Sequence, residues 1–227
     1  MKVMRTFLSG LMLHLLAAGA LMLSASNASA LTWDETTDGG GDAGYLLSTV
    51  QATTGAGALT QITGDITTPE DVDMYLISIT NASTFSATST GGLTYGPPRL
   101  FLFDATGNGV SGYVDSTNTG AAISDTLVVT PGTYHLALSG FSYPLAAGSQ
   151  EIWVMPGTTD VERAPDGVAA ASPLDDWSPS IVPFAVDSYT ITLTGAALVP
   201  EPSSLALAAL MLLSLLGCGR RRRQRGA

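Results

Sequence analysis

The segment that decides the fold is Val-Asp-Met-Tyr-Leu-Ile-Ser-Ile-Thr, residues 72–80. Successive side chains of a strand point to opposite faces, so Tyr75, Ile77 and Ile79 fall on one face. Asp71 and Asp73 continue that face at the entrance of the strand. The segment therefore predicts a β-strand with one apolar face and an acidic entrance.

A second strong strand is predicted at residues 99–103, Arg-Leu-Phe-Leu-Phe, which is apolar on both faces as a central strand should be. Shorter strands are predicted at 59–66, 83–89, 110–114, 123–129, 133–139 and 189–193. Turn residues separate them, as in Asp104-Ala-Thr-Gly-Asn-Gly109 and Pro131-Gly132. Many short strands between turns predict an antiparallel β-sandwich.

Four segments of this pattern occur in the order seen in bacterial pre-peptidase C-terminal domains. They are Asp71-Val-Asp-Met-Tyr-Leu-Ile77, Leu100-Phe-Leu-Phe-Asp-Ala-Thr-Gly107, Pro131-Gly-Thr-Tyr-His-Leu136 and Tyr189-Thr-Ile-Thr-Leu193. The chain resembles that family over residues 59–140 and 187–196. The resemblance implies an all-β, jelly-roll-like β-sandwich, here at residues 58–198, of the kind appended to secreted proteases and found in other extracellular proteins.

The chain departs from the family at residues 141–186, where a proline-rich insertion replaces a short connection. Such a long connection is either a functional surface loop or a mobile excursion. Trp153 and Trp177 lie within it. Their aromatic faces are candidate sugar-binding surfaces; the alternative is that they pin the insertion onto the sandwich.

Residues 31–57 are rich in Gly, Asp and Thr and are predicted to form a loose leader. Between residues 31 and 200 there are 18 Asp and Glu but only two Arg and no Lys, a formal charge of −16. Such an acidic surface repels nucleic acid and anionic lipid headgroups, so both are excluded as partners. The single cysteine, Cys218, lies outside this region. The stability of residues 31–200 must therefore come from packing rather than from disulfides.

Residues 1–30 have the organisation of a signal peptide. Lys2 and Arg5 precede an apolar stretch at residues 7–23, and Ala28-Ser-Ala30 is a small-x-small cleavage site. Cleavage by signal peptidase after Ala30 is expected; the alternative is an uncleaved membrane helix. Residues 1–30 are therefore set aside from the fold.

Residues 199–227 carry a second targeting pattern. Val199-Pro-Glu-Pro202 precedes an apolar run at residues 203–218 and an arginine cluster at Arg220, Arg221, Arg222, Arg223 and Arg225. As a helix the run would be roughly 24 Å long, slightly short of a ~30 Å hydrocarbon core. The arginines would stop transfer on the cytoplasmic side.

This tail, residues 199–227, resembles the PEP-CTERM sorting signal of bacteria that carry exosortases. The resemblance implies export through the inner membrane of a Gram-negative bacterium, transient anchoring by the apolar helix, and processing by an exosortase at the motif. The alternative is an ordinary C-terminal membrane anchor.

No catalytic constellation is found in the mature region. Its one histidine, His135, alternates within a strand and is expected to point to solvent or to the opposite face of the sheet. There is no nucleophile motif, zinc motif, phosphate loop or dinucleotide fingerprint. The carboxylate pairs Asp71/Asp73 and Asp175/Asp176 could in principle hydrolyse a glycoside, but surface acids of so acidic a chain are more often solvated. We therefore expect a protein that is not an enzyme.

Calcium is the one candidate ligand among metals and cofactors. Glu70, Asp71 and Asp73 group oxygen ligands at a strand entrance, which suits a hard cation. The alternative is that the aspartates accept backbone N–H bonds and cap the turn.

Two classes of function follow. The first is a non-catalytic surface or matrix protein, delivered by an exosortase and held among extracellular polysaccharide or biofilm. The second is a carbohydrate- or calcium-binding module.

Overall fold

The computed structural model describes residues 30–90, 97–128, 130–155, 157, 159–178 and 187–201. Within these ranges the chain is built of β-strands and one short 3-10 helix, η1 (Ala82–Thr84). The strands are β1 (Ala30–Asp34), β2 (Gln51–Ala52), β3 (Ala58–Ile66), β4 (Val72–Ile79), β5 (Ser86–Thr90), β6 (Arg99–Asp104), β7 (Gly109–Val114), β8 (Ala122–Ile123), β9 (Gly132–Ser139), β10 (Pro144–Ala146), β11 (Gln150–Glu151), β12 (Asp176–Trp177), β13 (Asp187–Thr194) and β14 (Ala196–Ala197).

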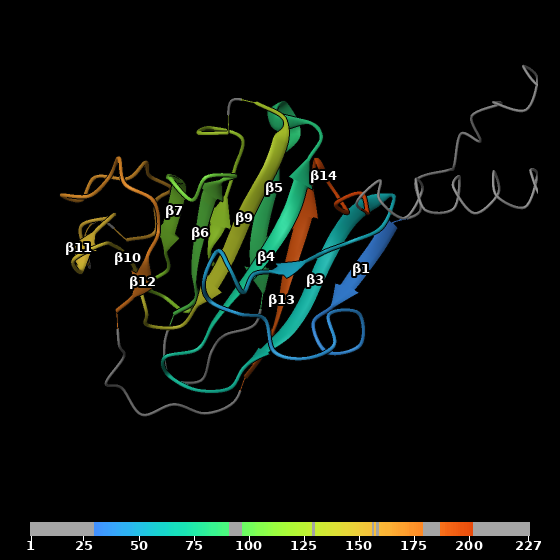
Figure 1. Ribbon diagram of the computed structural model, residues 1–227, viewed down its shortest axis with the longest axis horizontal. Helices are drawn as coiled ribbons and strands as arrows, with labels where there is room; N and C mark the ends of the chain where they lie inside the picture. The colour runs from blue at the N-terminus through green and yellow to red at the C-terminus, as the bar shows by residue number, and fades with distance from the viewer. Residues whose placement is uncertain are drawn as a thin grey trace, which may run out of the picture.

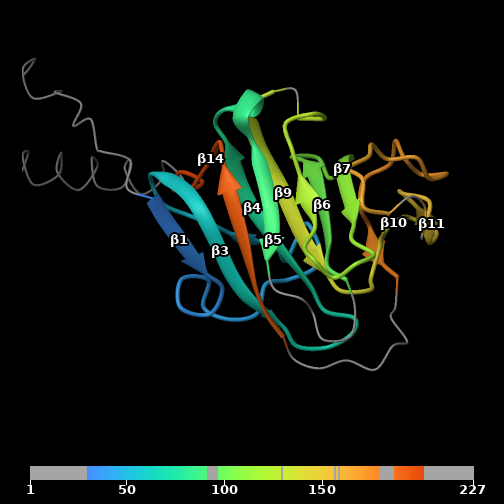
Figure 2. The same cartoon turned by 180° about the vertical axis from the view of Figure 1, so that it is seen from behind.

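Eleven strands form one sheet that curls until its two halves face each other (Figures 1 and 2). One half has the order β7-β6-β9-β4-β2, and the other has the order β1-β3-β13-β5-β8. The short strand β14 pairs with both β3 and β4 and so joins the halves. Pairing is antiparallel except for β1 with β3 and β2 with β4. The prediction of an all-β, antiparallel fold is confirmed, and the arrangement is consistent with a β-sandwich.

The main core lies between the two halves. The face of β4 predicted to be apolar packs there through Tyr75, Ile77 and Ile79, and β13 contributes Tyr189, Ile191 and Leu193. All six side chains are buried. Period-2 alternation in both strands thus places their apolar faces against each other.

Strand β6 is buried on both faces, as predicted from its composition. Leu100 and Leu102 enter the main core, whereas Phe101 and Phe103 point into a second apolar cluster. The partners there are Trp153 and Trp177 of the insertion, with ring centroids 5.1 Å apart for Phe101–Trp153 and 5.7 Å apart for Phe101–Trp177.

These contacts correct the assignment of Trp153 and Trp177 as sugar-binding residues. Trp153 is completely buried and Trp177 is 7% exposed, so neither presents an aromatic face to solvent. The indole N–H of Trp177 donates to the carbonyl of Tyr45 (2.7 Å) and that of Trp153 to the carbonyl of Arg163 (3.4 Å). Both tryptophans pin the insertion onto β6, which was the alternative interpretation.

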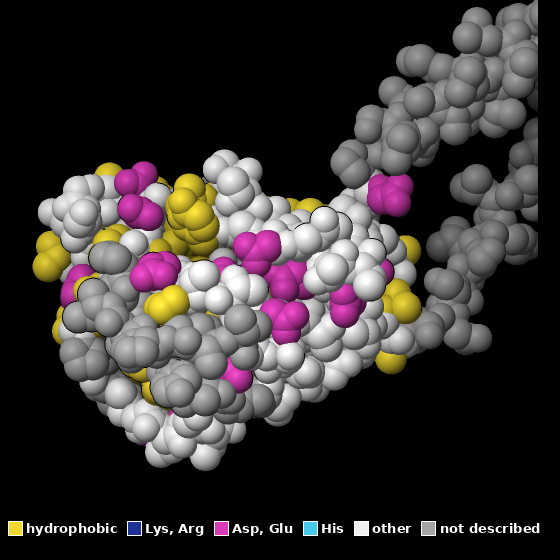
Figure 3. Space-filling view, turned by 90° about the horizontal axis from the view of Figure 1, so that it is seen from below, with side chains coloured by type: hydrophobic (Ala, Val, Ile, Leu, Met, Phe, Trp, Pro, Cys, Tyr) yellow, Lys and Arg dark blue, Asp and Glu magenta, His cyan; other side chains and the backbone are white. Residues whose placement is uncertain are grey.

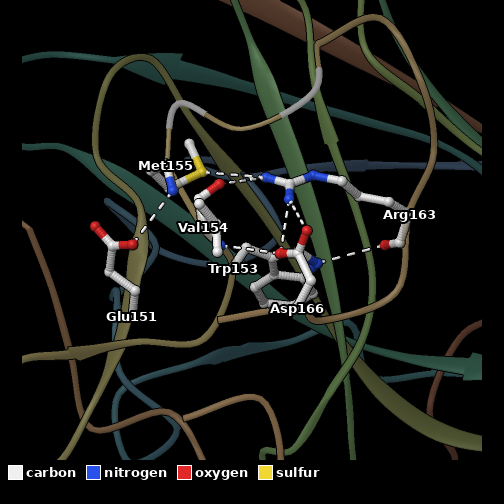
Figure 4. Close-up of polar contacts among 6 residues, drawn as sticks. All are labelled: Glu151, Trp153, Val154, Met155, Arg163 and Asp166. Carbon is white, nitrogen blue, oxygen red and sulfur yellow. Dashed lines mark hydrogen bonds and ion pairs between the residues drawn. The ribbon is translucent and has the colours of Figure 1, made fainter. Parts of the chain in front are cut away.

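Within the insertion, polar contacts centred on Arg163 join two stretches of the chain (Figure 4). Nη1 of Arg163 donates to both carboxylate oxygens of Asp166 (2.7 and 2.5 Å), and Nη2 donates to the carbonyl of Val154 (2.8 Å). The backbone of Arg163 exchanges two hydrogen bonds with Gly112 and thereby covers the edge of β7. A covered edge cannot pair with another chain.

The segment at residues 31–57 is not a loose leader. Its strand β1 pairs with β3, its strand β2 pairs with β4, and Trp33 and Ala43 are buried in the main core. Its glycines serve turns, since Gly40 and Gly41 have φ angles of 81° and 145°.

Other boundaries also differ from expectation. The strand predicted at 83–89 begins at Ser86, and it pairs with β13 and β8. The strand predicted at 123–129 is reduced to β8. The strand at 189–193 is followed by β14 after Gly195, whose φ of 67° turns the chain.

Candidate metal centre

Three carboxylates from distant parts of the chain meet at one end of the sandwich. Glu35 follows β1, Asp42 lies in the loop between β1 and β2, and Asp73 is the second residue of β4. Each can offer an oxygen within 4.8 Å of those of the other two. Viewed from below (Figure 3), acidic side chains gather near the middle of this end, and no Lys or Arg side chain is visible among the described residues there.

Backbone donors fix the position of Glu35. The amide of Ala43 donates to its Oε1 (2.7 Å) and the amide of Asp65 to its Oε2 (3.0 Å). The carboxylate therefore ties the loop after β1 to the end of β3. A Cβ at Gly64 would lie 2.5 Å from Oε2 of Glu35, so the close approach of β3 requires glycine there.

The loop that carries Asp42 is held by Gln51 of β2. Nε2 of Gln51 donates to the carbonyls of Glu35 (3.2 Å) and Gly41 (2.8 Å), and its Oε1 accepts from the indole N–H of Trp33 (2.7 Å). Asp42 itself is exposed. Its carboxylate is thus held at the rim of the site.

Asp73 is the unusual member of the cluster. Its side chain is completely buried, and neither carboxylate oxygen meets the geometry of a hydrogen bond to a described residue, although the Tyr189 hydroxyl and the Glu35 carboxyl lie close enough to interact with it. Burying an ionised carboxylate without a partner is costly, and buried polar atoms are nearly always hydrogen-bonded. An unpartnered pair of oxygens beside two further carboxylates is what a bound cation would satisfy.

The electrostatics of the three groups agree. Burial raises the pKa of Asp73 well above its ordinary value, and the charges of Glu35 and Asp71 raise it further. Burial is also the main cause of the raised pKa of Glu35, and the charge of Asp42 raises it further. Burial likewise raises the pKa of Asp42, and the charge of Asp71 adds to that shift. All three shifts have the same origin, negative charges brought together away from water.

Two buried tyrosines lie close enough to Asp73 to interact with its charge. The hydroxyls of Tyr75 and Tyr189 lie 2.5 Å apart and share a hydrogen bond in the core. Burial, followed by the charge of Asp73, raises the pKa of both phenols, so they remain neutral. The nearby Tyr189 hydroxyl lowers the pKa of Asp73, but by less than burial and the neighbouring charges raise it. The tyrosines therefore supply no countercharge to the carboxylates.

The donor set selects the kind of metal. Three carboxylates offer only oxygen, which suits hard cations such as Ca²⁺ and Mg²⁺ rather than metals that favour nitrogen or sulfur. The spacing of the carboxylates on three separate segments, one of them a loop, fits the longer and more flexible coordination of Ca²⁺ better than the tight octahedron of Mg²⁺.

Of the three residues predicted to bind calcium, only Asp73 lies in this cluster. The amide and hydroxyl of Thr67 donate to Oδ2 of Asp71 (2.6 and 2.8 Å), so Asp71 caps the turn before β4 while its charge acts on Asp42 and Asp73. Glu70 is exposed on that turn. Glu35 and Asp42 were missed because they belong to the segment interpreted as a loose leader.

The predicted processing sites fall at the ends of the described chain. Ala30 begins β1, whereas Ala28 lies outside the described residues. Val199 exchanges backbone hydrogen bonds with Thr53 (2.8 Å) and Gly55 (2.9 Å), and Pro200 and Glu201 are exposed. Pro202, the predicted membrane helix and the arginine cluster lie outside the described residues. No helix that the structure describes has the length and apolarity needed to cross a membrane.

The remaining residues that the sequence analysis considered for catalysis, Asp175, Asp176 and His135, lie outside the carboxylate cluster. Asp175 and Asp176 are exposed on the insertion, and Oδ1 of Asp176 accepts the amide of Trp177 (2.8 Å). His135 is buried, which excludes the solvent-facing alternative, and its Nδ1 lies 2.9 Å from the carbonyl oxygen of Asp104.

Neither a protein-family model nor a curated protein matches this chain. The site itself therefore has to support any statement about function.

Proposed function

We propose that the protein is a non-catalytic, calcium-binding β-sandwich module of an exported surface or extracellular-matrix protein. The observation that carries calcium binding is Asp73, buried and without a hydrogen-bond donor among the described residues, within 4.8 Å of Glu35 and Asp42. A divalent cation would neutralise charges that otherwise destabilise the fold. Extracellular modules bind calcium at roughly 10⁻⁴–10⁻³ M, so an affinity in that range would suffice outside the cell.

The sequence supports the route of delivery. A signal peptide at residues 1–30 and a tail resembling the PEP-CTERM signal imply signal peptidase and an exosortase as processing partners, with extracellular polysaccharide as the expected surroundings. The jelly-roll topology of pre-peptidase C-terminal domains is proposed for the sandwich on the same basis.

The position of the site fits an anchored module. Ala30 and Ala197 both pair with Ala58, so the two ends of the described chain leave from one end of the sandwich. Asp73 lies at the other end of β4, roughly 20 Å away along the strand. The metal centre and the ends of the described chain therefore lie at opposite ends of the sandwich.

Isothermal titration of the full chain with CaCl₂ tests the proposal. We expect one calcium per chain, with binding weakened at least about tenfold (~1.4 kcal/mol) by Glu35→Gln or Asp73→Asn, because each removes a charged ligand. Asp175→Asn is the matched control, since Asp175 is exposed and lies far along the chain in the insertion.

Absence of binding at 5 mM calcium would overturn the proposal. So would binding that Asp175→Asn weakens as much as Asp73→Asn, because the calcium would then sit in the diffuse acidic surface rather than in the cluster.

A further inference from the structure

We infer that the pocket beside Asp42 binds a neutral sugar, and that calcium in the Glu35–Asp42–Asp73 cluster is required for that binding. The inference rests on the proposed calcium site and adds the class of ligand that would complete it. The sugar site is thus proposed at this pocket, not at Trp153 and Trp177, which are buried.

A pocket of about 400 Å³ opens next to the cluster. Among the residues that line it are Trp33, Asp38, Asp42, Thr49, Gln51 and Thr54. Its volume lies within the range of about 300–1,000 Å³ typical of small-molecule sites. Asp42 belongs both to the cluster and to the pocket wall, so a ligand that contacts Asp42 in the pocket lies next to a ligand of the metal.

The coordination of the metal leaves room on this side. Three carboxylates supply three to six oxygens, whereas Ca²⁺ takes about six to eight. Glu35 and Asp73 are buried, whereas Asp42 is exposed, so Asp42 is the member of the cluster beside which a ligand from solvent can reach the metal. Two neighbouring hydroxyls of a sugar are oxygen ligands of the right size to occupy them.

The lining of the pocket favours hydroxyl groups. Carboxylates of Asp38 and Asp42 can accept hydrogen bonds from a sugar, and the Thr54 hydroxyl can donate or accept. Oδ2 of Asp38 already accepts the amide of Asp34 (2.8 Å), which fixes its carboxylate at the wall. Trp33 is 7% exposed, so recognition depends on hydroxyls more than on stacking.

Charge decides against acidic ligands. The region from residue 31 to 200 has a formal charge of −16, and calcium in one site offsets only two of those charges. Anionic sugars would be repelled by the remaining field, whereas neutral sugars would not.

The test is a titration of the full chain, kept in a detergent without a sugar headgroup, with mannobiose, cellobiose, maltose and galactobiose. Each is measured in 5 mM CaCl₂ and in EGTA, and the calcium affinity is measured separately. Thr54→Phe fills the pocket from an exposed position without altering a carboxylate. Thr88→Phe, at an exposed position of β5, is the matched control.

We expect at least one disaccharide to bind in calcium, no binding in EGTA, and a loss of at least about tenfold in Thr54→Phe but not in Thr88→Phe. Calcium binding in Thr54→Phe should stay within about twofold of wild type. If calcium binds but none of the four sugars does, the inference is wrong and the proposed function stands. Sugar binding that persists in EGTA, or that Thr54→Phe leaves unchanged, also overturns it. Failure of calcium itself to bind would overturn the proposed function instead.

Discussion

Asp73 occupies a position where a carboxylate destabilises the metal-free fold. Its oxygens are buried without a donor from the described residues, and Glu35 and Asp42 place further negative charge within 4.8 Å. A raised pKa means that the folded protein holds its proton more tightly than the unfolded chain does. The stability that this provides is complete below the ordinary carboxyl pKa of about 4 and is lost as pH rises through the raised pKa.

Replacing Asp73 should therefore raise the melting temperature without calcium and lower it in calcium. In EGTA at pH 7.5 we expect Asp73→Asn to melt at least about 2–4 °C above wild type, the shift that corresponds to roughly 1 kcal/mol in a chain of this size. Near pH 4 the two melting temperatures should converge, because Asp73 is then protonated. In saturating calcium at pH 7.5 wild type should melt higher. Thermal unfolding followed by circular dichroism measures all three.

A constant difference between the two proteins at both pH values would contradict this account, since it would show that the Asp73 charge is not the cause. Asp104→Asn is a control that should show the opposite dependence of stability on pH. Hydrogen bonds from Thr106 and Asn108 outweigh its burial and lower its pKa, so this substitution should destabilise the fold more at pH 7.5 than near pH 4.

At the scale of elements, the proposed metal centre would join the N-terminal segment to the sheet. Glu35 and Asp42 lie between β1 and β2, whereas Asp73 is on β4. Without a cation, three carboxylates repel one another across this junction. With one, the same groups hold the segment down.

Hydrogen exchange should report this directly. We expect calcium to slow exchange of amides in residues 35–52 by about tenfold or more, because opening the segment would then require loss of the metal. Amides of β6 and β9, which lie in the centre of their half of the sheet, serve as the internal control. Equal exchange in residues 35–52 with and without calcium would show that the metal does not join these elements.

The insertion is the other element that depends on tertiary contacts. Trp153→Ala removes a completely buried indole that packs on Phe101 and Phe103, and we expect it to lower the free energy of unfolding by about 3–5 kcal/mol. Val168→Ala, at a side chain that is 89% exposed, should change it by less than about 0.5 kcal/mol. Urea denaturation compares the two, and a Trp153→Ala protein as stable as wild type would mean that the insertion is not part of the cooperative fold.

The same elements show what a sequence can predict. The strands at β4, β6 and β13 were predicted because alternation or a doubly apolar run is local and strong. β1 was missed because its pairing with β3 is parallel and joins segments far apart in the sequence. The residues that follow β1 are rich in Gly and Asp, and on their own they indicate a loose chain. Asp73 was a candidate from its position at a strand entrance, but its partners Glu35 and Asp42 belong to a distant segment and become neighbours only through that pairing.

At the scale of the whole molecule, the ends of the described chain and the proposed metal site lie at opposite ends of the sandwich. Both described ends leave beside Ala58, and Val199, the first residue of the proposed sorting motif, still pairs with the chain just after β2. Pro200 and Glu201 beyond it are exposed and therefore accessible to a processing enzyme.

Mass spectrometry of the protein recovered from the surface of its native host tests this arrangement. We expect a mature chain that begins at Leu31 and has lost the arginine cluster at residues 220–225, because the proposed processing by signal peptidase and an exosortase would remove the two ends. Recovery of surface protein with the arginine cluster intact would contradict processing at the motif.

The central claim is that calcium binds among Glu35, Asp42 and Asp73, and the most direct measurement is a crystal structure from 5 mM CaCl₂ with calcium located by anomalous scattering. The account predicts one anomalous peak about 2.3–2.6 Å from oxygens of all three side chains. A well-ordered site without a peak, or a peak bound by Glu70 and Asp71 instead, would contradict it.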